Sequence, residues 1–218
     1  MLTYFYGAYK MLLAVDPSLT CSGWALFSPK NEQLLAVGKV RALPPKHALA
    51  SRLSDLQKQI YELLKELKLS SNDVLVCEAA TTIRDPRAAF IVEQVRTIFE
   101  SVARSFRLTV PGRVNPRTVQ YEIMGLRGKQ VDRKTVKQTA IEVVGALYSV
   151  ELKKLGLLNE KSSDLKKHQD IVDAMLIGRL VLSRLKDASL AGTSLEEMLS
   201  ENERAGMRSR RRWKYGNS

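Results

Sequence analysis

The sequence predicts an α/β protein with a mixed sheet flanked by helices. Three observations lead to this fold class. First, residues 1–40 contain three short apolar runs without helical spacing. Second, apolar residues recur at intervals of three and four from residue 47 onward. Third, strand-like and helix-like segments alternate after that helix. The predicted order is βββαβαβ followed by helices, which is typical of a sheet with helices packed against it.

The three N-terminal runs are predicted to be strands of an antiparallel meander. They read "MLLAVD" (11–16), "GWALFS" (23–28) and "QLLAVGKV" (33–40). Their links, "DPSLTCS" and "PKNE", are short and contain turn-forming residues. The first run is apolar on both faces, as expected of a buried strand.

The middle of the chain alternates between the two periods. Leucine and isoleucine spacing predicts an amphipathic helix over about 47–68, and the turn residues "SSND" lead into a fourth strand, "DVLVCE" (73–78). Helical spacing returns over 86–106, and "RLTVPG" (107–112) is expected to be a fifth strand.

The remaining chain is predicted to be mostly helical. A short helix with a glycine-rich basic loop (115–130) precedes a helix over 133–148, and the polar stretch 159–169 leads to a last helix from about 168 to 186. We expect an N-terminal extension (1–10), one α/β domain (11–186) and a basic, flexible tail (187–218) that includes the weakly amphipathic "SLEEMLSENER".

Positive charge points to a polyanionic partner. The formal net charge is +12 and the isoelectric point about 9.8, which favours nucleic acid. Residues 204–218 hold six arginines and lysines and no acid. Trp213 and Tyr215 in this segment are placed either to stack on bases or to form part of a solubilising tail.

The two cysteines and the apolar runs exclude several classes of protein. Cys21 and Cys77 lie in apolar surroundings, so neither a disulfide framework nor a paired-cysteine metal motif is expected. Apolar runs are too short for a membrane span, and the first ten residues lack a secretory pattern. An intracellular, reducing compartment is predicted.

Four acids are the strongest candidates for chemistry. Asp16 ends the first strand and Glu78 the fourth, and the carboxyl ends of strands are where open α/β sheets place their sites. Asp170 and Asp173 are three residues apart on the apolar face of the last helix. Each has an alternative: a turn residue for Asp16, a surface acid for Glu78, and a helix cap for Asp170.

If these carboxylates converge, a cation must lie between them, because like charges in one site repel. Oxygen ligands alone favour Mg²⁺, with Mn²⁺ as a substitute. Two such ions activate water and stabilise the leaving oxygen of a phosphodiester. This chemistry suits a basic, nucleic-acid-binding protein.

Several segments resemble the RuvC-type Holliday junction resolvase family, in the order in which that family has them. They are "LAVDPSLTCSGWALF", "VLVCE", "NPRTVQYEIMGLRGKQVDRKTVKQ" and "HQDIVDAMLIG", and together they span about residues 11–186. The resemblance implies an RNase H-like fold, with three antiparallel strands followed by two parallel ones. Departures from the family's compact pattern indicate a divergent member, such as a phage or mobile-element protein.

The resemblance also implies a metal-dependent endonuclease. Its catalytic, metal-binding acids match Asp16, Glu78, Asp170 and Asp173. Family members act as homodimers that nick opposing strands of a four-way DNA junction, which leaves 5′-phosphate and 3′-hydroxyl ends. The helix at 86–106 would lie at the dimer interface.

Basic residues that match the family's DNA-binding segment are Arg117, Arg127, Lys129, Arg133 and Lys134. A solvated surface run is the alternative. Lys134 is favoured over Lys137 as the cation that stabilises the scissile phosphate. His168 is either an assistant to the attacking water or a helix N-terminal residue without a chemical role.

One departure concerns how a junction would be opened. Where many family members carry an aromatic residue after the glutamate, this chain has Thr81 and Thr82. Arg84 and Arg87, which follow, are expected to contact phosphates. Two alternatives to junction resolution stay open: a nuclease for flaps, forks or RNA–DNA hybrids, and a DNA-binding protein without activity.

Overall fold

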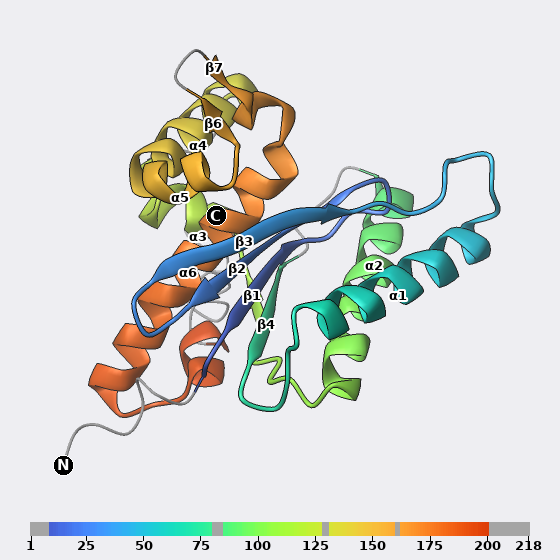
Figure 1. Cartoon of the computed structure of the whole chain (residues 1–218), viewed down its shortest axis with the longest axis horizontal. Coiled ribbons are helices and arrows are strands. Elements are labelled where there is room, and N and C mark those ends of the chain that lie inside the picture. Colours follow the sequence, from blue (N-terminus) through green and yellow to red (C-terminus); the bar gives the residue numbers. More distant parts are fainter. Residues whose placement is uncertain (1–8, 80–84, 128–130, 160–161, 201–218) are drawn as a thin grey trace, which may run out of the picture.

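A five-stranded sheet forms the centre of the molecule (Figure 1). The computed structural model describes residues 9–79, 85–127, 131–159 and 162–200. The strands are β1 (Leu12–Asp16), β2 (Ser22–Ser28), β3 (Gln33–Val40), β4 (Val74–Glu78) and β5 (Arg113–Val114). Their order is β3-β2-β1-β4-β5; β1, β2 and β3 are antiparallel, and β4 and β5 are parallel to β1. The predicted mixed sheet is therefore confirmed.

The helices follow the predicted order, except that α5 was not predicted. They are α1 (Leu49–Glu66), α2 (Pro86–Ser105), α3 (Pro116–Glu122), α4 (Arg133–Leu147), α5 (Ser149–Lys154) and α6 (Gln169–Ala191). A small hairpin of β6 (Leu158–Asn159) and β7 (Ser162–Ser163) and a 3₁₀ turn, η1 (Asp164–Lys167), occupy the polar stretch before α6. No helix in the described part of the chain is long and apolar enough to cross a membrane.

Local sequence explains where three helices begin. Asp85, Asn115 and Asp132 precede α2, α3 and α4, and each side chain accepts a hydrogen bond from a backbone N–H of the first turn. In α2 and α3 a proline occupies the start of the helix. Both features stabilise a helix N-terminus, because the first N–H groups have no partner within the helix.

The sheet separates two apolar layers. Leu12 and Ala14 of β1 pack into the layer that contains α6, and Leu13 and Val15 into the layer under α1 and α2. This alternation follows from the two-residue period of a strand. Figure 1 shows α1 and α2 on one side of the sheet and α6, with α3 to α5, on the other.

The fifth strand differs from its prediction. It was expected over 107–112, but β5 is Arg113–Val114, and the earlier segment contributes one bridge, between Thr109 and Val74. Arg107 has φ +63° and Gly112 has φ +150°, and Pro111 between them lacks an N–H. These backbone features prevent a continuous strand before Arg113.

Residues beyond 186 add to the core as far as they are described. The last helix continues past its predicted end to Ala191, and Gly192 follows in the left-handed conformation. Residues 195–200 are helical, and Leu195 and Leu199 are buried in the layer that contains α6. The basic segment 204–218, with Trp213 and Tyr215, lies outside the described residues.

Two glycines let α6 approach β2. A Cβ atom at Gly23 would lie 2.0 Å from the backbone oxygen of Asp170, and one at Gly178 would lie 2.1 Å from the Phe27 ring. A side chain at either position would therefore push α6 away from the sheet. The close approach at Gly23 brings the first turn of α6 onto β2, next to the end of β1.

We expect Gly23→Ala to lower the free energy of unfolding by about 1–3 kcal/mol, because the obstructing atoms are backbone and cannot turn aside. Urea unfolding followed by circular dichroism measures this. Gly145→Ala is the matched control: a Cβ there meets nothing within 4 Å, and in a helix it should stabilise by about 0.5–1 kcal/mol. Equal effects of the two substitutions would contradict the close approach.

Candidate active site

Asp16 and Glu78 lie side by side at one edge of the sheet. They are the last residues of β1 and β4, whose parallel register runs up to the pair directly before them. Two residues earlier, Ala14 and Val76 pack into the layer that contains α6. By strand alternation, both carboxylates therefore point toward α6.

Asp170 and Asp173 come to the same place from α6. The Asp170 carbonyl lies against Gly23, and Gly23 pairs with Asp16 across β1 and β2. The cap residue of α6 is His168, and Asp170 lies within the first turn. The alternative that Asp170 is the helix cap is therefore wrong.

Two of these acids have a polar partner. Lys39 Nζ of β3 donates a hydrogen bond to Asp170 Oδ2 at 2.8 Å and so forms an ion pair. Gln169 Nε2 donates to Asp173 Oδ1 at 2.9 Å. Asp170 is therefore held by a cation and Asp173 by a neutral amide.

The remaining electrostatics show mutual repulsion. Burial, followed by the charges of Glu78, Asp173 and Asp170, raises the pKa of Asp16 well above its ordinary value. Burial and the charge of Asp173 raise the pKa of Glu78 to about 7. Burial likewise raises the pKa of Asp173 to about 6, with Asp170 adding to it. The four acids thus form one electrostatic cluster. A turn residue at Asp16 or an isolated surface acid at Glu78 would not have its pKa raised by the other acids in this way.

Asp170 is the exception within the cluster. Burial alone would raise its pKa, but hydrogen bonds from Lys39 and Cys21, with the charges of Lys39 and Arg41, outweigh that effect and lower it. Asp170 therefore carries a stable negative charge, whereas the other three compete for protons.

A divalent cation fits this donor set by its chemistry. Partly buried carboxylates that raise one another's pKa have a deficit of positive charge, and hard cations prefer such oxygen ligands. In the described part of the chain, no three His, Cys, Asp or Glu side chains are placed to hold an ion together as they stand. Lys39 occupies one oxygen of Asp170 and Gln169 one oxygen of Asp173, so an ion bound there would compete with these two hydrogen-bond donors for the carboxylates.

A buried arginine lies behind the strand ends. Arg96 of α2 is 1% exposed, and its Nε donates to the Glu78 carbonyl at 2.6 Å. Arg96 also forms an ion pair with Glu93. Arg113 of β5 in turn pairs with both Glu93 and Glu100, each at 2.7 Å. The Arg96 charge opposes the rise in pKa of both Asp16 and Glu78. This network ties α2 and β5 to the end of β4.

The predicted DNA-binding residues are mostly at the surface. Those that the structure describes as exposed are Arg87, Arg117, Arg127, Arg133 and Lys134. Arg127 lies 5.6 Å from the centre of the Tyr121 ring. Arg84, Lys129, Thr81 and Thr82 lie outside the described residues.

A basic groove of about 710 Å³ runs beside the acids. Its lining includes Arg133, Lys134 and Lys137 of α4, Lys166 of η1, and Gln169, the hydrogen-bond partner of Asp173. The positive charges of Lys137 and Arg133 partly offset the rise in the pKa of Asp173 that burial causes. The role given to Lys134 at the scissile phosphate stays a prediction. His168 is partly buried, and its Nδ1 has no hydrogen-bond partner in the described structure.

Three residues of the site were missed from the sequence. Lys39 is the one charged residue in its predicted strand, and Arg96 lies among the apolar positions of its helix. These are weak signals, because each identifies a charge in an apolar segment but not its partner. Gly23 belongs to the segment "LAVDPSLTCSGWALF" that resembles the RuvC-type family, but its contact with the first turn of α6 was not predicted.

The acid cluster should make the ion-free protein less stable as pH rises. Between pH about 4 and 7 the unfolded chain loses the protons of Glu78 and Asp173 while the folded chain keeps them, so the free energy of unfolding falls. One pKa unit is worth about 1.4 kcal/mol. We therefore expect Glu78→Gln to match the wild type near pH 4 and to be more stable at pH 8 by a few kcal/mol.

Urea unfolding at both pH values in the presence of a chelator tests this expectation. Mn²⁺ should stabilise the wild type at pH 8 far more than Glu78→Gln. Glu66→Gln, an exposed position on α1, is the control. A Glu78→Gln variant that is less stable than the wild type at pH 8 would argue against repulsion in the cluster.

Known proteins that resemble this chain were found among solved structures. No family model and no curated protein matches the sequence. Among solved structures, RuvC of Thermus thermophilus in complex with a Holliday junction substrate matches at 16% identity, with a TM-score of 0.57, over 84% of this chain and 97% of that one. A second Thermus thermophilus RuvC structure matches at 17% identity, with the same TM-score and coverage. The chain therefore has the RNase H-like fold of the RuvC structures, as its resemblance to that family predicts.

Proposed function

We propose that this protein is a structure-selective DNA endonuclease that resolves four-way junctions with divalent ions. The observation that carries the proposal is the convergence of Asp16, Glu78, Asp170 and Asp173 at one edge of the sheet, beside a basic groove. The fold shared with a RuvC bound to a Holliday junction supports this choice of substrate.

The four acids would hold Mg²⁺ or Mn²⁺, two ions for each site. Bound ions would activate the attacking water and neutralise charge on the leaving oxygen. The chain itself contributes the orientation of the carboxylates, through the ends of β1 and β4 and the first turn of α6. The products would be 5′-phosphate and 3′-hydroxyl ends.

The basic groove would hold the DNA backbone next to the cleaved phosphate. Its lysines and arginine come from α4 and η1 and face the side of the cluster where Asp173 lies. Phosphate contacts of this kind position a nucleic acid without reading its bases. Selectivity for a junction would then depend on shape rather than on sequence within the groove.

Two nicks on opposing strands require two sites, so we propose a homodimer through α2. Phe90 on this helix is 63% exposed, a large apolar side chain that a partner would cover. Arg96 and Glu93 of the same helix reach the end of β4 through the ion network. Dimerisation would thus set the geometry of the two cleavage sites.

Cleavage of synthetic DNAs tests the function. A mobile four-way junction, a flap, a replication fork, an RNA–DNA hybrid and a linear duplex of matched length are each incubated with the protein in Mg²⁺. Symmetric nicks in the junction, with rates well above those for the other substrates, support junction resolution. Faster cutting of flaps, forks or hybrids would show that the preferred substrate is one of these rather than the junction. Junction binding without cutting in either Mg²⁺ or Mn²⁺ would indicate a DNA-binding protein without nuclease activity.

A further inference from the structure

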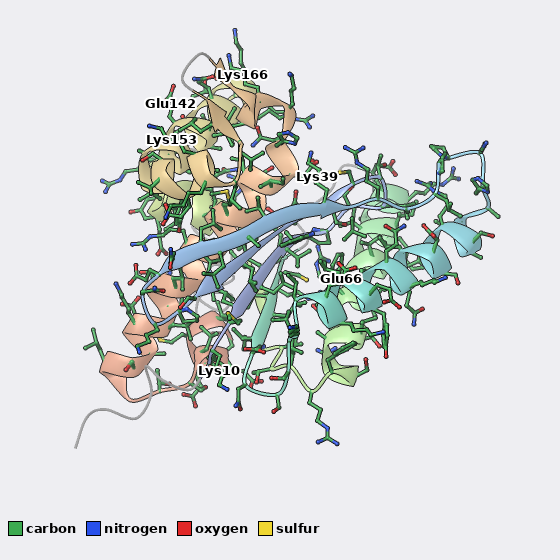
Figure 2. All side chains as sticks on the ribbon, in the orientation of Figure 1. Lys10, Lys39, Glu66, Glu142, Lys153 and Lys166 are labelled. Atoms are coloured by element: carbon green, nitrogen blue, oxygen red, sulfur yellow. The ribbon has the colours of Figure 1, made fainter. Side chains whose placement is uncertain are left out.

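Lys39 occupies an unusual position in the acid cluster. In the register of the sheet, Asp16 of β1 pairs with Gly23 of β2, and Gly23 pairs with Lys39 of β3. The neighbouring Gly38 lies against Trp24, in the layer under α1 and α2, so Lys39 faces the α6 side (Figure 2). Asp16, Gly23 and Lys39 are thus neighbours across three strands. Because Gly23 lacks a side chain, the first turn of α6 fits between the side chains of Asp16 and Lys39.

The lysine is held in the protein rather than in water. Its side chain is 13% exposed, and Nζ donates to Asp170 Oδ2 at 2.8 Å and to the Lys167 carbonyl at 3.4 Å. Asp170, the carboxylate it binds, is one that a divalent ion would need. A carboxylate oxygen that accepts a hydrogen bond from an ammonium group is a poorer ligand for a second cation, because the two cations repel each other.

The proposed function leaves this ion pair unexplained. If all four acids are needed to bind ions, a neutral residue at position 39 would give tighter ion binding. Lys39 instead neutralises Asp170 when no ion is bound. An incoming DNA strand brings phosphates that an ammonium group also binds. On bound DNA, Lys39 would therefore have a second possible anionic partner besides Asp170.

We propose that Lys39 is a positioning residue that withholds Asp170 from divalent ions until DNA is bound. A DNA phosphate takes over the Lys39 ammonium, and Asp170 is released to the ion. This inference rests on the proposed function for its DNA partner. Ion binding and DNA binding then strengthen each other by the same factor, as thermodynamic linkage requires. A protein with this device would not bind its ions tightly away from DNA.

Direct titration of the DNA-free protein with Mn²⁺, followed by the electron paramagnetic resonance of the free ion, tests the first half. We expect Lys39→Met to bind Mn²⁺ about tenfold more tightly than the wild type, a typical size for a coupling between sites. Lys39→Gln, which keeps a neutral hydrogen-bond donor, should also bind more tightly and serves if the methionine variant fails to fold. Lys186→Met is the matched control, because Lys186 pairs with Glu32 away from the cluster.

The second half is tested with Ca²⁺ and a four-way junction, by measuring how much Ca²⁺ raises the affinity for the junction. This factor should be about tenfold smaller in Lys39→Met than in the wild type. Unchanged or weaker Mn²⁺ binding by both Lys39 variants would overturn the proposal, as would no Mn²⁺ binding by any variant. The Mn²⁺ titration involves neither DNA nor cleavage, so a wild type that fails to cut junctions would overturn the proposed function and leave this result standing.

Discussion

Asp16→Asn is expected to reduce junction cleavage on the order of 10³–10⁴-fold, the usual cost of removing one member of a catalytic group that acts as a unit. Asp16 interacts with each of the other three acids, since the charges of Glu78, Asp173 and Asp170 all raise its pKa. The asparagine has the same shape but cannot supply a negatively charged ligand. Single-turnover cleavage of a four-way junction in Mg²⁺ measures the effect.

The same substitution should leave the fold intact. An amide in place of Asp16 removes a repelling charge, so the variant should be at least as stable as the wild type at pH 8 and should still bind the junction. Asp55→Asn is the matched control, because Asp55 lies on α1, which packs against the other face of the sheet. Equal cleavage by Asp16→Asn and the wild type would show that the acids are not catalytic.

Arg96→Met is expected to lower the free energy of unfolding by about 1–3 kcal/mol, because it leaves the Glu78 carbonyl without its donor and removes one of the two cations that pair with Glu93. The Glu78 carbonyl loses the donor that lies 2.6 Å away, and Glu93 keeps Arg113 alone. Urea unfolding measures the loss. Arg104→Met on the same helix is the control: its side chain is 57% exposed and lies 3.7 Å from Glu100, so the cost should stay below about 1 kcal/mol.

Arg96 should also affect the acids in front of it. Its charge lowers the pKa of Asp16 and Glu78, so both pKa values should rise further in Arg96→Met. Cleavage by the variant should then require a higher pH than cleavage by the wild type, and a pH–rate profile shows the shift. A variant that unfolds with wild-type stability and has an unchanged profile would mean that Arg96 neither supports β4 nor tunes the site.

Local patterns predicted the elements that carry the acids. Each of β1 and β4 is a short apolar run that ends in a carboxylate, and the period of two explains why both side chains face the same layer. The spacing of three between Asp170 and Asp173 likewise predicted a shared helix face. The fifth strand was misplaced because residues 108–110 (Leu, Thr and Val) all favour strands, and the backbone turns at Arg107 and Gly112 carry no periodic signal.

The sequence by itself determined the order of strands and helices, the excess of positive charge and the four acids as the candidate site, because these depend on neighbours along the chain. Only the tertiary structure decided which partners the acids meet. Lys39 and Asp170 are 131 residues apart, and they meet because α6 crosses β2 at a glycine. Arg96 reaches the Glu78 carbonyl because α2 packs against β4. Such pairings depend on how packed layers bring distant segments together, which no local period records.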